Sequence, residues 1–135
     1  MTDLRHQFKL PDTDQEYLDG LKLPWETIKQ DNQQWLLLHG WQVVAGYNHQ
    51  TVTIALLIDA NYPDTQIDSF YVFPVLKRND GGNIKQSAHL QTIDQKQFQF
   101  WSRHRTQANP WRTGTDDIAS HLALVSEWLK RSLSD

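Results

Sequence analysis

The residues with the clearest potential for covalent chemistry lie in one segment, 98–111, which reads FQFWSRHRTQANPW. Ser102 lies two residues before His104, and a serine becomes a nucleophile when a neighbouring imidazole accepts its proton. The two side chains must then meet in space, and neither a GxSxG motif nor a third orienting residue can be assigned from the sequence. Ser102 and His104 are therefore the candidate catalytic residues. The alternative is a solvated loop whose tryptophans dock into the core.

Aromatic and cationic side chains surround this pair, because Trp101, Arg103, Arg105 and Trp111 belong to the same segment. An arginine binds a carboxylate or an acidic partner through paired hydrogen bonds, so we expect these four residues to take part in binding. The cluster also offers the one argument for a nucleic-acid partner, but a net charge of −3 argues against it.

Other kinds of chemistry find little support. The chain has no cysteine, and its six histidines show no HxH, HxxxH or HExxH spacing, so we expect no metal site. Neither GxxxxGK[ST] nor GxGxxG occurs, and we expect no cofactor. Asp59, Asp64 and Asp68 lie in or near one turn, and turn formation explains them without any acid–base role.

Composition indicates one globular domain spanning residues 1–135, with 39% hydrophobic and 21% charged residues. The start of the chain lacks the apolar core of a secretory signal. The longest apolar stretch, Ile54–Ile58, is far too short to cross a membrane. We therefore expect a cytoplasmic protein without a membrane partner.

Periodicity predicts the elements that must position the candidate residues. A short helix is expected over 14–21, and strands over 35–39, 41–45, 51–58 and 69–73. A polar flap follows over 82–110, in which 98–100 alternates like a short strand. The chain ends in a helix capped by Thr115, with an apolar stripe formed by Ile118, Leu122, Val125, Leu129 and Leu133 and widened by Trp128. Strands grouped together between terminal helices are typical of an α+β fold.

This layout resembles the ubiquitin-conjugating enzymes, and most of all their prokaryotic family E. The Tyr62-Pro63 turn looks like the Tyr-Pro turn of that superfamily, and Trp111 looks like the tryptophan that precedes the next helix. The resemblance covers residues 10–133. It implies an N-terminal helix, a four-stranded antiparallel meander, a long flap that bears the active site, and a C-terminal helix. It also implies binding roles for Tyr62 and Pro63.

The resemblance further implies a bacterial ubiquitin-like protein and a ubiquitin-activating-type enzyme as partners. The family's catalytic cysteine and its His-Pro-Asn tripeptide are both absent, so a thioester relay is impossible. Two possibilities stay open: a pseudoenzyme that only binds these partners, or a hydroxyl relay in which Ser102 carries an oxyester and His104 is the base. A different class also stays open, a small-molecule-binding or hydrolase domain that uses His104 and the neighbouring aromatic residues.

Overall fold

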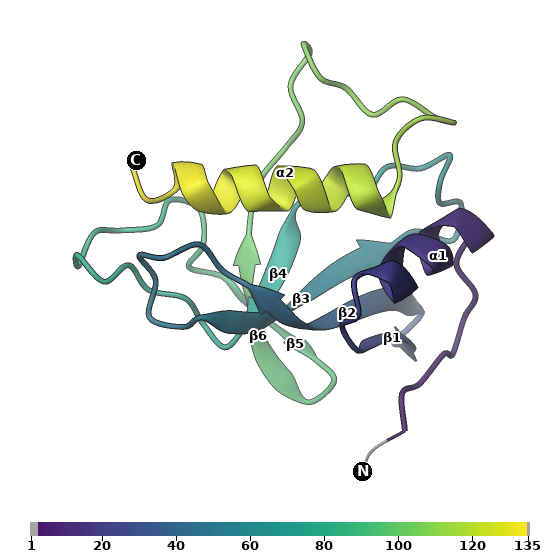
Figure 1. The fold of residues 1–135 in the computed structure, drawn as a ribbon, viewed down its shortest axis with the longest axis horizontal. Helices are drawn as coiled ribbons and strands as arrows, with labels where there is room; N and C mark the ends of the chain where they lie inside the picture. Colours follow the sequence, from purple (N-terminus) through teal and green to yellow (C-terminus); the bar gives the residue numbers. More distant parts are fainter. Residues whose placement is uncertain (1–2, 135) are drawn as a thin grey trace.

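A six-stranded antiparallel sheet with one helix at each end of the chain forms the molecule (Figure 1). The computed structural model describes residues 3–134. Its elements, in chain order, are α1 (Asp12–Gly20), β1 (Trp25–Gln30), β2 (Gln33–Gln42), β3 (Thr51–Ile58), β4 (Phe70–Phe73), β5 (Leu90–Ile93), β6 (Lys96–Trp101) and α2 (Ile118–Arg131). The predicted α+β class is confirmed.

The sheet differs from the predicted four-stranded meander in two respects. β1 to β4 do form an antiparallel meander, but the flap contributes a hairpin that extends the sheet to the order β1-β2-β3-β4-β6-β5. β1 was not predicted. The strand expected over 35–39 and the first part of the one expected over 41–45 belong to a single strand, β2, which ends at Gln42, so residues 43–45 lie outside it. Gly40, with φ of 76°, lies where the register with β3 shifts between Leu38 and Trp41. A bulge at this glycine keeps the strand continuous.

The main core lies between α2 and the face of the sheet that this helix crosses (Figure 1). Ile118, Leu122, Val125 and Leu129 of the predicted stripe are buried there. Leu133, the fifth member, lies beyond the end of the helix and is partly exposed. A smaller apolar cluster, built around Trp35 and Phe98, covers the opposite face.

α2 begins later than predicted. Its N-cap is Asp117, not Thr115, because the Asp117 carboxylate accepts a hydrogen bond from the backbone N–H of Ser120 at 3.0 Å. The Ser120 hydroxyl in turn accepts the N–H of Asp117, which completes a capping box. The first turn of α2 also contacts α1, since the buried Asp14 accepts the N–H of Ile118 at 3.3 Å.

The sheet curls until its two outer strands are joined by side chains. The amide of Gln30, at the end of β1, donates to the carbonyl of Thr92 in β5 and accepts the N–H of Asp94, both at 2.9 Å. Arg5 bridges the carboxylates of Glu26 and Asp94 at 2.9 and 2.7 Å. The two bonds of Gln30 satisfy backbone groups at the outer edge of the sheet that would otherwise be unpaired.

Candidate functional site

Ser102 and His104, which sequence spacing selected, meet where the chain leaves β6. The Oγ of Ser102 lies 3.2 Å from Nε2 of His104. Trp101 is the last residue of β6 and is buried. It therefore anchors the backbone from which the side chains of Ser102 and His104 extend. Ser102 is partly exposed, and 64% of the His104 side chain is accessible, so an incoming reactant can approach both groups.

A third residue, Asp68, completes a hydrogen-bonded chain that the sequence did not reveal. Nδ1 of His104 lies 3.0 and 3.1 Å from the two carboxylate oxygens of Asp68. An ionised carboxylate only accepts, so Nδ1 carries the proton and Nε2 of the neutral imidazole is the acceptor for the Ser102 hydroxyl. Asp68 therefore does more than form a turn. The order hydroxyl–imidazole–carboxylate is that of the serine-hydrolase triad.

Strand pairing explains why Asp68 lies there. β4 pairs with β6 in the register Phe70↔Trp101, so the residues just before β4 lie opposite those just after β6. Asp68 and His104 are separated by 36 residues in the chain, and this pairing brings their segments side by side. Knowing that β6 joins the sheet next to β4 would have been enough to find the carboxylate from the sequence.

Ser69 fastens the two segments together. Its hydroxyl donates to the carbonyl of Arg103 at 2.9 Å and accepts the N–H of Arg103 at 3.1 Å. Its own carbonyl accepts a bond from Nε2 of His121, in α2, at 2.8 Å. Ser69 is buried and has φ of 58°, a left-handed conformation that is costly for a residue with a Cβ. Such strain persists where the surroundings impose it, and here the two hydrogen bonds to Arg103 join the segment of Asp68 to that of His104.

His121, which bonds to the carbonyl of Ser69, is fully buried. Burial disfavours the charged imidazole and lowers the pKa of His121 to about 4, a shift to which the nearby positive charge of Arg105 adds. The ring is therefore neutral near pH 7. Because its Nε2 carries the proton donated to Ser69, Nδ1 is an acceptor, and within residues 3–134 it has no hydrogen-bond partner.

Two backbone donors near Ser102 are already engaged. The N–H of Ser102 donates to the carbonyl of Gln86 at 3.0 Å, and the N–H of Arg103 donates to Ser69. They cannot also form an oxyanion hole in this arrangement. The guanidinium of Arg103 lies beside Ser102, and its Nη1 donates to the backbone carbonyl of Ser102 at 2.9 Å. Positive charge at the site thus comes from a side chain.

Trp101 supports the site from within the core. Its side chain is fully buried, packs against Tyr47 and Phe70, and donates from Nε1 to Gln99 at 2.8 Å. The Arg103 guanidinium lies 5.0 Å from the centre of its ring. With no exposed surface, Trp101 orients its neighbours and offers no contact to a partner in this conformation.

The other predicted binding residues gather in a second cluster. Trp111 donates from Nε1 to the carbonyl of Pro63 at 3.0 Å, and its ring lies 6.1 Å from that of Tyr62. The guanidinium of Arg105 lies 4.9 Å from the centre of the Trp111 ring, and Nη1 is 3.5 Å from Asp116. The structure thus unites Tyr62, Pro63, Arg105 and Trp111, and only 5% of the Arg105 side chain is accessible.

The residues that the structure describes contain neither a metal-binding cluster nor a membrane-spanning helix. Within residues 3–134, no group of three or more histidine, aspartate or glutamate side chains is arranged to hold a metal ion. No helix in the same residues is long and apolar enough to cross a membrane.

A protein-family model matches most of the chain. Residues 10–132 match the model of the family described as Prokaryotic E2 family E. No curated protein and no solved structure gives a significant match. The architecture, with a helix at each end of an antiparallel curled sheet, is consistent with an E2-like fold.

Proposed function

Because this chain belongs to Prokaryotic E2 family E, we propose that it acts in a bacterial ubiquitin-like conjugation pathway. It binds the ubiquitin-like protein and its activating-type enzyme, as the family relationship suggests. It has no cysteine, so the acyl acceptor of this chain is a hydroxyl, that of Ser102. The observation that supports this assignment is the hydrogen-bonded chain from Ser102 through His104 to Asp68.

The transfer step follows from the order of these bonds. Nε2 of His104 removes the proton of Ser102 as Oγ attacks the thioester carbonyl carbon of the ubiquitin-like protein on its activating enzyme. The C–O bond forms, the C–S bond breaks, and the imidazolium returns its proton to the departing thiolate. Asp68 stabilises the imidazolium meanwhile, and no oxidation or reduction occurs.

The second step would release the acyl group to an acceptor. An oxyester is less reactive toward an amine than a thioester, so this step needs more assistance than the first. His104 accepts the proton of the attacking amine and gives it to Oγ of Ser102 as the C–O bond breaks and an amide forms. The guanidinium of Arg103 is bonded to the backbone carbonyl of Ser102 and to the hydroxyl of Ser132, so it places a positive charge beside Ser102.

The test is adduct formation with the matching ubiquitin-like protein, activating enzyme and ATP. We expect a covalent adduct that resists thiols and is released by hydroxide, that is absent in Ser102→Ala, and that forms more slowly in His104→Ala. Ser134→Ala, a change at an exposed serine outside the site, is the matched control and should form the adduct normally. Partner binding without any adduct in the unmodified chain would leave a binding protein and refute the hydroxyl relay.

A second candidate function, ester hydrolysis, is favoured by the same geometry. Hydroxyl, imidazole and carboxylate lie in the order used by serine hydrolases. Release of nitrophenol from a small activated ester, without any ubiquitin-like protein and lost in Ser102→Ala, would support it. A chain that forms the protein adduct but does not turn over small esters would exclude hydrolysis as the main activity.

A further inference from the structure

The end of β6 places Ser102 on the face of the sheet that α2 does not cover. Successive side chains of an extended chain point to opposite faces, and Trp101 and Arg103 both point toward α2. Trp101 belongs to the core beneath this helix, and Arg103 donates from Nη2 to the hydroxyl of Ser132 at 2.9 Å. The N–H groups of Phe100 and Ser102 both donate to carbonyls of the segment just before β5, so the alternation continues through Ser102. The Ser102 hydroxyl therefore lies on the same face as Phe100.

Aromatic and aliphatic side chains extend from Ser102 across this face. Phe100 precedes Ser102 by two residues, a spacing that places their side chains about 7 Å apart along the chain. The ring of Tyr71, in β4, is centred 4.9 Å from that of Phe100, and the ring of His89 stands perpendicular to it at 6.1 Å. Leu57 is the diagonal neighbour of Tyr71 across the pairing of β3 with β4. Leu57, Tyr71 and Phe100 thus form an apolar surface beside the candidate nucleophile.

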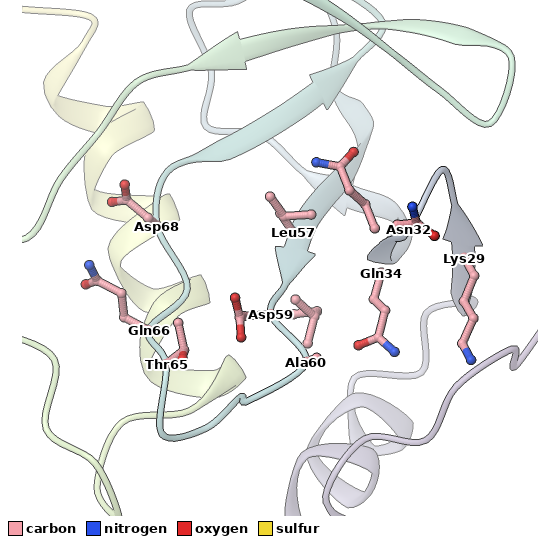
Figure 2. A pocket seen from close by; sticks show the side chains of 11 residues that line it. Lys29, Asn32, Gln34, Leu57, Asp59, Ala60, Thr65, Gln66 and Asp68 are labelled. Atoms are coloured by element: carbon pink, nitrogen blue, oxygen red, sulfur yellow. The ribbon is translucent and has the colours of Figure 1, made fainter.

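The apolar surface is accessible to a ligand and adjoins the hydrogen-bonded chain. Its three side chains are each partly exposed, whereas their neighbours on the α2 face are buried. Figure 2 shows Leu57 between the segment that bears Asp68 and the start of β2, where it lines a cleft of about 600 Å³. Burial raises the pKa of the Tyr71 phenol, and the Asp68 carboxylate adds to this shift, as expected of neighbouring groups.

We propose that the apolar surface binds the segment of the acyl donor that precedes the carbonyl carbon attacked by Ser102, and that this segment carries apolar side chains. The inference rests on the proposed function and adds the chemistry of the acyl donor and its position on the sheet. An acyl chain bonded to Oγ of Ser102 starts on this face, and two extended residues span the distance to Phe100. His104 occupies the other side of the hydroxyl. Aromatic rings offer large apolar contact areas, and a charged side chain placed against them would lose hydration without a partner.

The test uses the absence of cysteine, because Ser102→Cys introduces a single thiol where the acyl group would be attached. Two peptides that end in a cysteamine thiol, acetyl-Leu-Ala-Leu-Ala-cysteamine and acetyl-Ser-Ala-Ser-Ala-cysteamine, compete for this thiol by disulfide exchange in excess 2-mercaptoethanol. Mass spectrometry of the intact chain gives the fraction that carries each peptide. Since both form the same disulfide, the ratio of the fractions at equilibrium reports the contacts of each peptide with the surrounding surface. We expect the apolar peptide to be favoured by about fivefold or more.

Substitutions in the Ser102→Cys chain test which side chains carry this preference. Phe100→Thr and Tyr71→Thr each remove a ring but keep a residue suited to a strand, and each should bring the ratio of the two peptides close to one. Leu90→Thr is the matched control, because Leu90 is an exposed apolar residue of β5 that lies opposite Gln99, on the other face of the sheet. It should leave the ratio unchanged. Ser134→Cys, which places the thiol at an exposed serine outside the site, should show no preference.

Equal labelling of Ser102→Cys by the two peptides, the same preference at Ser134→Cys, or a preference that survives both ring removals would each overturn the assignment of the apolar surface. The two proposals fail separately, because the exchange requires neither a ubiquitin-like protein nor a nucleophilic serine. Adduct formation at Ser102 without a peptide preference would refute the acyl-donor surface alone. A peptide preference without any Ser102 adduct would refute the hydroxyl relay and leave the surface a site for apolar peptides.

Discussion

Replacing Ser69 tests whether this residue holds Asp68 against His104. Ser69→Ala removes both hydrogen bonds to the peptide groups of Arg103, at 2.9 and 3.1 Å, and leaves a donor and an acceptor in a partly buried place without a partner. Each lost partner costs about 1–1.5 kcal/mol, so the free energy of unfolding should fall by about 2–3 kcal/mol. Alanine also keeps the full cost of a left-handed φ of 58°.

Ser69→Gly separates the hydrogen bonds from the backbone strain. Glycine loses the same two bonds but adopts a left-handed conformation without a Cβ clash, which recovers about 1 kcal/mol or more relative to alanine. The expected order of stability is therefore unmodified chain, then Gly, then Ala. The order should invert at Ser126, within α2, where glycine costs about 1 kcal/mol more than alanine.

Urea unfolding of these four variants and the unmodified chain gives the comparison. If Ser69→Ala were as stable as the unmodified chain, the hydroxyl would not fasten the loop. If Ser69→Gly were less stable than Ser69→Ala, the positive φ would not be strained. Either result would refute the reasoning. Loss of the two hydrogen bonds between Ser69 and Arg103 should also slow adduct formation at Ser102, because Asp68 would no longer be fixed beside His104.

Three further predictions concern the core around the site. The pKa of buried His121 lies near 4 against an ordinary 6.5, so the unfolded chain binds the proton first, and the free energy of unfolding should fall as pH decreases from 6.5 to 4. The decrease in the free energy of unfolding between pH 6.5 and pH 4 should be smaller in His121→Gln, as measured by urea unfolding at several pH values. Tyr47→Phe removes a buried 2.6 Å hydrogen bond to the Leu129 carbonyl and should lower the free energy of unfolding by about 1–3 kcal/mol, measured in the same way. Gln99→Leu leaves three buried partners without a hydrogen bond and should lower the melting temperature more than Tyr47→Phe does in thermal unfolding.

Local pattern was sufficient for some elements and insufficient for others. β3 has the predicted bounds because its β-branched apolar run is buried along one face of the sheet and partly buried along the other. β1 was missed because Glu26 and Thr27 make the segment polar although both are buried. Their polar groups are compensated by distant partners, Arg5 for Glu26 and the carbonyl of Phe8 for Thr27. Such compensation cannot be read from a local window.

The candidate site, too, could be predicted from local sequence only in part. The Ser102–His104 contact was predictable because the two residues are only two positions apart in the chain. The contact between Asp68 and His104 was not predictable, because it depends on which strands pair in the sheet. The same holds for the strain at Ser69, since a left-handed serine has no sequence signature when long-range hydrogen bonds impose the conformation.

The most direct measurement is mass spectrometry of the digested chain after incubation with its ubiquitin-like protein, activating enzyme and ATP. The account predicts that the peptide containing Ser102 carries the C-terminal remnant of the ubiquitin-like protein as an ester, and that hydroxide removes it. Attachment at another residue, or a bound partner with no covalent remnant on any peptide, would contradict the claim that Ser102 replaces the missing cysteine.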